Sequence, residues 1–221
     1  MNPIKITTVN TDEPLLGKSK WWGAPDLPAS VPFPYTTYID EDGEEYPQPL
    51  TFICQIRLRD IADIDTDNLL PHTGMLYFFA DIDYFLGEDA PLVMPLHNYS
   101  GDMIRVMYID QESDLEPYDI TWEGTDESIF RKAEAICFNT SDAEFCHEFL
   151  SEPFEDEVRE KYSNHISLLS IQEDERWTLR FFDCGTMYFL IDKEGLSGNL
   201  VGISINLCKS IQKELFINDT S

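Results

Sequence analysis

The first residues that could do chemistry are carboxylates that stand close together in the sequence. Three aspartates have the spacing that opens a calcium-binding loop: Asp63, Asp65 and Asp67. The sixth position of that loop is Asn68 instead of glycine and the twelfth is Gly74 instead of glutamate, so the pattern fails. A second group of carboxylates follows an apolar run and is read as a solvated loop: Asp81, Asp83, Glu88 and Asp89. We therefore expect no metal ion and no other cofactor.

Histidine and cysteine are placed poorly for zinc binding or nucleophilic catalysis. The histidines are far apart, and neither an HExxH nor a CxxC pattern occurs. Cys146 and His147 are adjacent on a predicted helix, where their side chains would point about 100° apart. That geometry suits a nucleophile and its base poorly. The chain also lacks a G-x-S-x-G elbow, a Walker A loop and a GxGxxG turn, so binding is favoured over catalysis.

Two polar residues lie inside apolar, strand-like segments and are candidates for a binding site. Gln55 stands in the run at 50–56, and Asp183 stands between Phe182 and Cys184 before Gly185. A buried amide must find hydrogen-bond partners. Gln55 therefore either recognises a ligand in a pocket or bridges backbone groups between strands, and the second role is favoured. Asp183 presents the same choice, since an Asx turn could use it to shape a corner.

A tryptophan pair near the beginning of the chain could form an exposed anchor for a partner. Trp21 and Trp22 precede a proline-rich stretch that also contains Phe33. Tryptophan is enriched in binding hot spots. However, exposed aromatic patches of this size are unusual, which favours an extended segment that tucks the rings over the core.

Charge is the most distinctive property of the composition. Asp and Glu number 42 against 15 Lys and Arg, so the formal net charge is -27. Such a chain repels phosphate backbones and anionic membranes, which excludes nucleic acid and membrane surfaces as expected partners. It would attract a basic protein, in a salt-sensitive way. The alternative is that the charge serves only solubility.

The elements that must position these residues are mostly strands. Apolar runs predict strands at 50–56, 75–80, 92–96, 104–109, 118–122, 166–171, 177–182, 186–191 and 201–207. The acidic stretch at 40–45 is predicted to be an exposed turn between extended arms. A capping-box pattern at 141–144, followed by Phe145 and Phe149, predicts a helix, and a second helix is predicted at 155–162.

A short internal repeat links the two ends of the chain. The motif LTFICQI followed by GMLYFF is echoed by ISLLSI followed by GTMYFL. This alignment pairs Gly74 with Gly185 and makes Tyr77 and Tyr188 equivalent, so both tyrosines join the candidate binding residues. We expect one domain at 1–221 with a pseudo-repeat at about 50–110 and 166–208. The expected fold is mainly β with a few helices, resembling a β-roll or barrel; the alternative is α+β.

The same motifs resemble those of the YwqG-like family. The resemblance rests on WGAPDLP at 22–28, PLTFICQI at 49–56, LPHTGMLYFF at 70–79, LLSI at 168–171 and FDCGTMYFLI at 182–191. Ser170 departs from the pattern, which favours glutamine there, and so does Trp22. The resemblance implies a bacterial protein with a β-roll or barrel-like fold and no assigned activity. Relatives near toxin-immunity genes suggest a protein-binding role.

Together these observations predict an acidic protein-binding module with a basic partner, of immunity or regulatory type. The alternative is an enzyme or small-ligand binder that uses carboxylates near Gln55 and Asp183. Odd, scattered cysteines and an N-terminal segment without an apolar core favour a cytoplasmic location.

Overall fold

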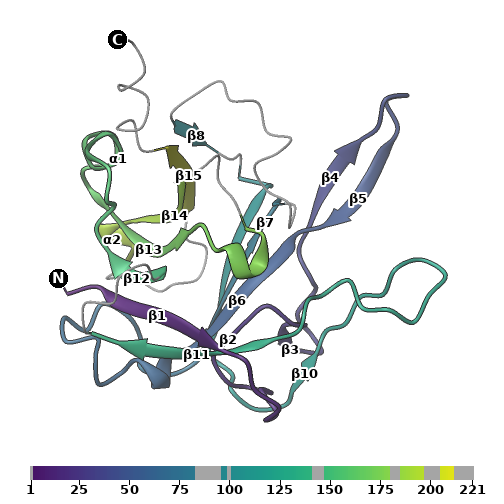
Figure 1. The fold of residues 1–221 in the computed structure, drawn as a ribbon, viewed down its shortest axis with the longest axis horizontal. Helices are drawn as coiled ribbons and strands as arrows, with labels where there is room; N and C mark the ends of the chain where they lie inside the picture. The colour runs from purple at the N-terminus through teal and green to yellow at the C-terminus, as the bar shows by residue number, and fades with distance from the viewer. Residues whose placement is uncertain are drawn as a thin grey trace.

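The chain folds around one large antiparallel sheet that curls on itself (Figure 1). The computed structural model describes residues 2–82, 96–98, 101–140, 147–179, 185–196 and 205–211. Eleven strands pair in the order β8 (Leu96–Asn98), β15 (Ile205–Ile211), β14 (Gly185–Asp192), β13 (His165–Gln172), β12 (His147–Ser151), β1 (Ile4–Val9), β11 (Glu134–Asn139), β2 (Lys20–Trp21), β6 (Thr51–Arg57), β7 (Met75–Ala80) and β9 (Ile104–Ile109). Cα atoms of β9, at one edge, come within 8 Å of those of β15 near the other. The predicted mainly β, barrel-like class is therefore confirmed.

The strand order reads the same way outward from the central β1–β11 pair. On one side β12 is followed by the meander β13-β14-β15, and on the other β2 is followed by the meander β6-β7-β9. The register shifts once in each first hairpin, between Phe52 and Cys54 and between Ser167 and Leu169. These positions are equivalent in the predicted repeat. The duplication remains a prediction, which this matching register supports.

Smaller elements complete the fold. β3 (Asp26–Pro28) pairs with β10 (Leu115–Pro117), and β4 (Tyr35–Ile39) pairs with β5 (Glu45–Pro49) in a separate hairpin. The helical elements are short: α1 (Asp156–Lys161), α2 (Lys193–Leu196) and the 3-10 turns η1 (Leu58–Asp60) and η2 (Glu175–Trp177). The predicted acidic turn joins β4 to β5 with Gly43 at φ 83°, as expected.

Three predicted elements are wrong. Phe149 lies in β12, where it pairs with Ile4 and Leu169, so no helix reaches it; residues 141–146 lie outside the described part. Long-range strand pairing overrides the local helical spacing there. The predicted strand at 118–122 contributes only an isolated bridge at Thr121. Of the strand predicted at 177–182, Trp177 lies in η2 and Leu179 makes only an isolated bridge with Asp174, and residues 180–182 lie outside the described part.

The core has one main cluster inside the curl, a smaller one beneath the β3–β10 pair and a third that includes Val158 and Tyr188. The main cluster includes the buried side chains of Trp21, Trp22, Phe78, Phe149 and Phe189. The smaller cluster contains Phe52, Phe79 and Tyr77 with Leu27 and Leu115. Because alternate residues of β7 face opposite sides, this single strand supplies both clusters. The polar group of Tyr77 is thereby placed beside β3.

Candidate functional site

A buried polar cluster lies where β2, β3, β6 and β7 meet. Strand pairing sets Lys20 directly opposite Gln55, and Gln55 opposite Tyr77. The chain then turns after β2, so that Asp26 at the start of β3 faces the same point. Asp26 and Gln55 are fully buried, and Lys20 is 5 % exposed. Four polar side chains from separate segments therefore share one site.

Asp26 is held by every neighbour in this cluster. Its Oδ1 accepts from Lys20 Nζ at 2.8 Å, and its Oδ2 accepts from Gly17 N at 2.8 Å and Gln55 Nε2 at 2.7 Å. Its backbone N–H donates to Gln55 Oε1 at 2.9 Å, and its carbonyl accepts from the Tyr77 hydroxyl at 2.6 Å. Such complete pairing is what a buried carboxylate requires.

An open groove of about 490 Å³ lies over this cluster. Lys20 and Asp26 are part of its lining, together with the segment 11–16, Pro117, Lys132 and Ala133. Burial lowers the pKa of Lys20, and the attraction of Asp26 opposes that shift. A ligand in the groove would therefore meet one buried cation that is held in place by a fixed carboxylate.

The structure places two of the six predicted binding residues in this polar cluster. The six are Trp21, Trp22, Gln55, Tyr77, Asp183 and Tyr188. Gln55 and Tyr77 belong to the cluster, but both are fully buried and neither lines the groove. Lys20 and Asp26 are the members of the cluster that line it. Tyr188 is buried elsewhere and donates its hydroxyl to Glu155, and Asp183 lies outside the described residues. Trp21 and Trp22 are at most 2 % exposed, so they do not form an exposed anchor.

The two tryptophans instead pack in a group of aromatic rings at the seam between β2, β12 and η2. The rings of Trp21, His147 and Trp177 are nearly parallel, with centroids 4.6 to 5.3 Å apart. Trp22 meets Trp21 and Trp177 edge-on. Trp22 has φ 57°, in the left-handed region, and this turn lets two consecutive rings enter one cluster.

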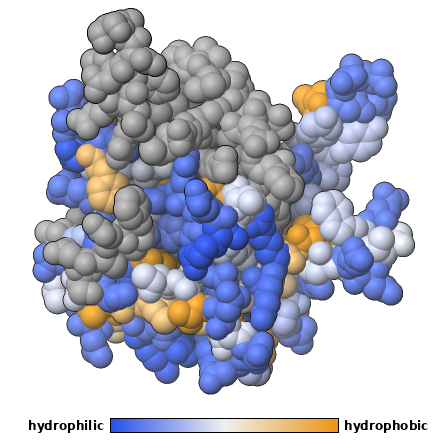
Figure 2. Space-filling view, in the orientation of Figure 1, coloured by the Kyte–Doolittle hydropathy of each residue, from blue (hydrophilic) through white to orange (hydrophobic). Residues whose placement is uncertain are grey.

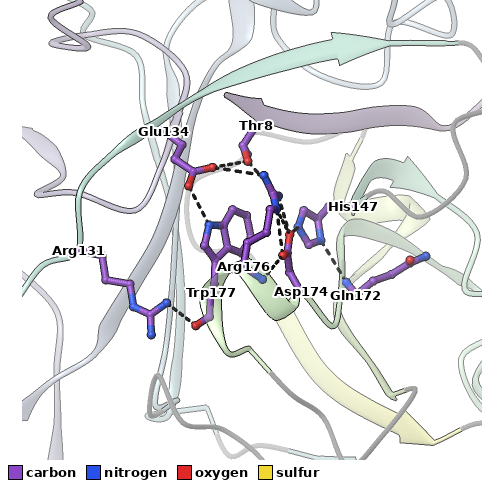
Figure 3. Close-up of polar contacts among 8 residues, drawn as sticks. All are labelled: Thr8, Arg131, Glu134, His147, Gln172, Asp174, Arg176 and Trp177. Atoms are coloured by element: carbon purple, nitrogen blue, oxygen red, sulfur yellow. Dashed lines mark hydrogen bonds and ion pairs between the residues drawn. The ribbon is translucent and has the colours of Figure 1, made fainter. Parts of the chain in front are cut away.

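A polar network surrounds these rings and joins β1, β11, β12 and η2 (Figure 3). The buried carboxylate of Glu134 accepts from Trp177 Nε1 at 3.0 Å and from the hydroxyl of Thr8. Arg176 lies over the Trp177 ring, 5.0 Å from its centre, and donates repeatedly to Asp174. These contacts tie strands that are more than a hundred residues apart in sequence.

His147 in this network is poorly suited to act as a base. Its Nδ1 accepts from the backbone N–H of Gln172 at 3.2 Å, which leaves the proton on Nε2, 3.9 Å from Asp174 Oδ2. Burial lowers the pKa of His147 to about 4; Asp174 opposes this shift and Arg176 adds to it. The lone pair of the His147 ring is therefore occupied. Among the described residues, no cysteine or serine nucleophile lies at hydrogen-bond distance from this ring. The network therefore supports packing between β2, β12 and η2.

A third feature is the β4–β5 hairpin, hereafter the arm, which projects away from the body (Figure 1). Four large apolar or aromatic side chains on it are between 47 % and 58 % exposed: Tyr35, Tyr38, Ile39 and Tyr46. Asp40 orders the turn by accepting from the backbone N–H groups of Asp42 and Glu44 at 3.0 and 2.8 Å. The arm therefore presents exposed rings beside a structured acidic turn.

No three histidine, cysteine, aspartate or glutamate side chains in the described ranges gather as a metal site would require. Likewise, none of the helices described is long and apolar enough to cross a membrane.

The sequence signals for the cluster were incomplete. Gln55 was recognisable as a polar residue in an apolar strand, but Lys20 and Asp26 resemble ordinary surface charges. Their one visible signal is position, because they flank the two buried tryptophans. Residues 19–162, which include the whole cluster, match a family described as a domain of unknown function (DUF1963). No curated protein matches the chain.

Proposed function

Because the chain belongs to the DUF1963 family, a domain of unknown function, we propose a function from its own surface: it binds a basic protein through the arm. The finer assignments from the sequence motifs form part of this proposal. They are YwqG-like membership, a bacterial source and a cytoplasmic location. The observation that carries the proposal is the arm's exposed aromatic surface next to a fixed acidic turn.

The exposed rings are arranged as a binding surface. Tyr38 and Tyr46 are directly opposite each other in the hairpin, so they lie on one face. Tyr35 and Ile39 are on the other face. Tyrosine supplies a large contact area at a low cost in conformational entropy and is frequent among hot-spot residues. An isolated two-stranded hairpin in water gains little by exposing such side chains, which supports a role in contact with a partner.

One edge of the arm is open to further pairing. β5 contains Pro47 and Pro49, which lack N–H donors and so discourage a strand from adding there. Among the described residues, β4 pairs only with β5, and its other edge is unpaired. An extended segment of the partner could add to β4 by main-chain hydrogen bonds.

Charge defines the chemistry of that partner. Figure 2 shows hydrophilic residues at the tip of the arm, where four carboxylates are exposed: Glu41, Asp42, Glu44 and Glu45. The whole chain carries a formal net charge of -27. Lysine and arginine side chains on the partner would be steered to the tip, and association would weaken as salt screens the attraction.

The test is affinity capture from cell extract at low salt, followed by titration of the purified captured protein. Three variants are compared with the wild type. Tyr38→Ser/Tyr46→Ser removes the ring pair, and Glu41→Gln/Glu44→Gln removes two charges from the tip. Glu152→Gln/Glu160→Gln removes the same charge from exposed positions at and before α1, which lies across the body from the arm (Figure 1).

We expect a basic protein that salt releases, that both arm variants lose, and that the α1-side control retains. Loss of binding at least tenfold greater in the ring variant than in the control is the expected size for a hot-spot pair. Equal weakening by the two charge variants would mean that bulk charge alone attracts the partner, and the arm proposal would then be wrong. Binding that survives all three variants would also overturn it.

A further inference from the structure

Lys20 is a buried cation with unused hydrogen-bonding capacity at the floor of the groove. Its side chain is 7 % exposed, and it lines the groove. A lysine ammonium group has three N–H donors. Within the part of the chain that the structure describes, the ammonium group of Lys20 makes one hydrogen bond, to Asp26 Oδ1. The ammonium group can therefore donate to an acceptor that enters the groove.

Asp26 is not available to a ligand in the same way. Both of its oxygens already accept from protein donors, and Gln55 and Tyr77 fix its backbone. A carboxylate clamped like this keeps Lys20 in one position, which is how binding sites reduce the entropic cost of ordering a charged side chain. Of the two charged groups at the floor of the groove, the Lys20 ammonium group is thus the one that can bond to a ligand.

The other residues that line the groove indicate the polarity and size of the rest of the ligand. Pro14, Leu15 and Leu16 form an apolar stretch of lining, with Pro117 and Ala133 also present. Lys132 is a second cation in the lining, and it pairs with Asp12 at 3.3 Å where both side chains are exposed. The exposed carboxylate of Glu13 also lines the groove, and it pairs with Lys18. A volume of about 490 Å³ falls in the range of small-molecule sites. The strongly negative chain disfavours a polyanion, because repulsion grows with ligand charge.

The other half of the sheet offers an internal comparison. Glu148 is opposite Ser170 there, as Lys20 is opposite Gln55 here. Ser170 bonds to Ser151 and Ser167 at 3.0 and 2.8 Å, and Glu148 pairs with Lys5. The equivalent place is thus filled by contacts within the protein. The lysine, the amide and the groove occur together only in the first half of the described sheet.

We propose that this groove binds a monocarboxylate with an apolar body. The carboxylate accepts from Lys20 Nζ, the apolar body lies along Leu15 and Leu16, and Lys132 adds attraction at the rim. A free aliphatic acid and the C-terminus of a short peptide present this same chemistry. The site is separate from the arm, so the two proposals can fail independently.

The experiment is ligand titration of the full chain, followed by NMR. The ligands are hexanoate, its uncharged analogue hexanamide, and the tripeptide Gly-Gly-Leu with a free or an amidated C-terminus. Lys20→Met tests the floor cation. Lys132→Met and Leu16→Ser change exposed side chains and keep the test valid if Lys20→Met fails to fold. Lys161→Met, an exposed lysine on α1, is the matched control.

We expect the free carboxylates to bind at least tenfold more tightly than the amides. Lys20→Met should abolish binding, Lys132→Met and Leu16→Ser should weaken it at least threefold, and Lys161→Met should leave it unchanged. A preference for the peptide over hexanoate would identify a chain terminus as the source of the carboxylate, and the reverse would identify a free acid. Equal binding of acid and amide, absence of binding, or equal loss in Lys132→Met and Lys161→Met would overturn the proposal.

Discussion

Protonation of His147 should destabilise the fold as the pH falls below neutrality. Burial places its folded pKa at about 4, below the ordinary value of 6.5. Between these values the unfolded chain binds a proton that the folded chain does not, so stability is present above pH 6.5 and is lost as the pH falls toward 4. At pH 5 the free energy of unfolding should have fallen by about 2 kcal/mol, which is more than half of the full effect expected when the folded pKa is about 4 and the unfolded pKa is 6.5.

The assay is urea unfolding of the wild type and of His147→Gln, at pH 7.5 and pH 5. Glutamine keeps a neutral polar side chain but does not titrate. At pH 7.5 the wild type should be the more stable, because it has the ring stacking and the bond from Gln172. By pH 5 that advantage should shrink by about 2 kcal/mol. NMR titration of the His147 ring gives an independent check, and a midpoint near 6.5 or a constant gap would refute the reasoning.

Four further substitutions are compared by urea unfolding, two in the buried networks and two at turn glycines. Trp177→Phe leaves Glu134 without its indole donor and should cost about 1–3 kcal/mol, whereas a neutral result would mean that the bond contributes nothing. Gln55→Leu leaves its buried backbone partners unpaired and should cost about 2–4 kcal/mol; an unchanged midpoint would contradict the clamp. Gly74→Ala should cost more than Gly43→Ala by about 1–3 kcal/mol, because both have positive φ but only at Gly74 would a Cβ meet backbone, at 2.7 Å.

The sequence predicts the strands well where burial and turns agree. The run 50–56 and the run after Gly74 become β6 and β7, since each is apolar and is bounded by turn residues. The helix predicted through Phe149 fails because its spacing is a local signal, whereas β12 owes its conformation to β1 and β13. Strand pairing of that kind brings together residues whose separation in sequence carries no local pattern.

The candidate sites are less predictable for the same reason. Gln55 is recognisable because an amide in an apolar strand must be bonded. Lys20 and Asp26 become recognisable as site residues only when β2 and β3 pack against Gln55. The network of Thr8, Glu134 and His147 has no sequence signature, because its members meet only after the central strands have paired.

The central position of β1 also affects how the chain folds during synthesis. β1 pairs on one side with β11 and on the other with β12, so Lys5 is opposite both Asn139 and Glu148. A ribosome must add about 130 residues after β1 before β11, the first of its two neighbours, is complete, which takes on the order of ten seconds. Until then the apolar side chains of Ile4 and Ile6 have no strand to cover them. Closure of the sheet is therefore a late event, and chaperones that shield nascent chains should bind this N-terminal strand.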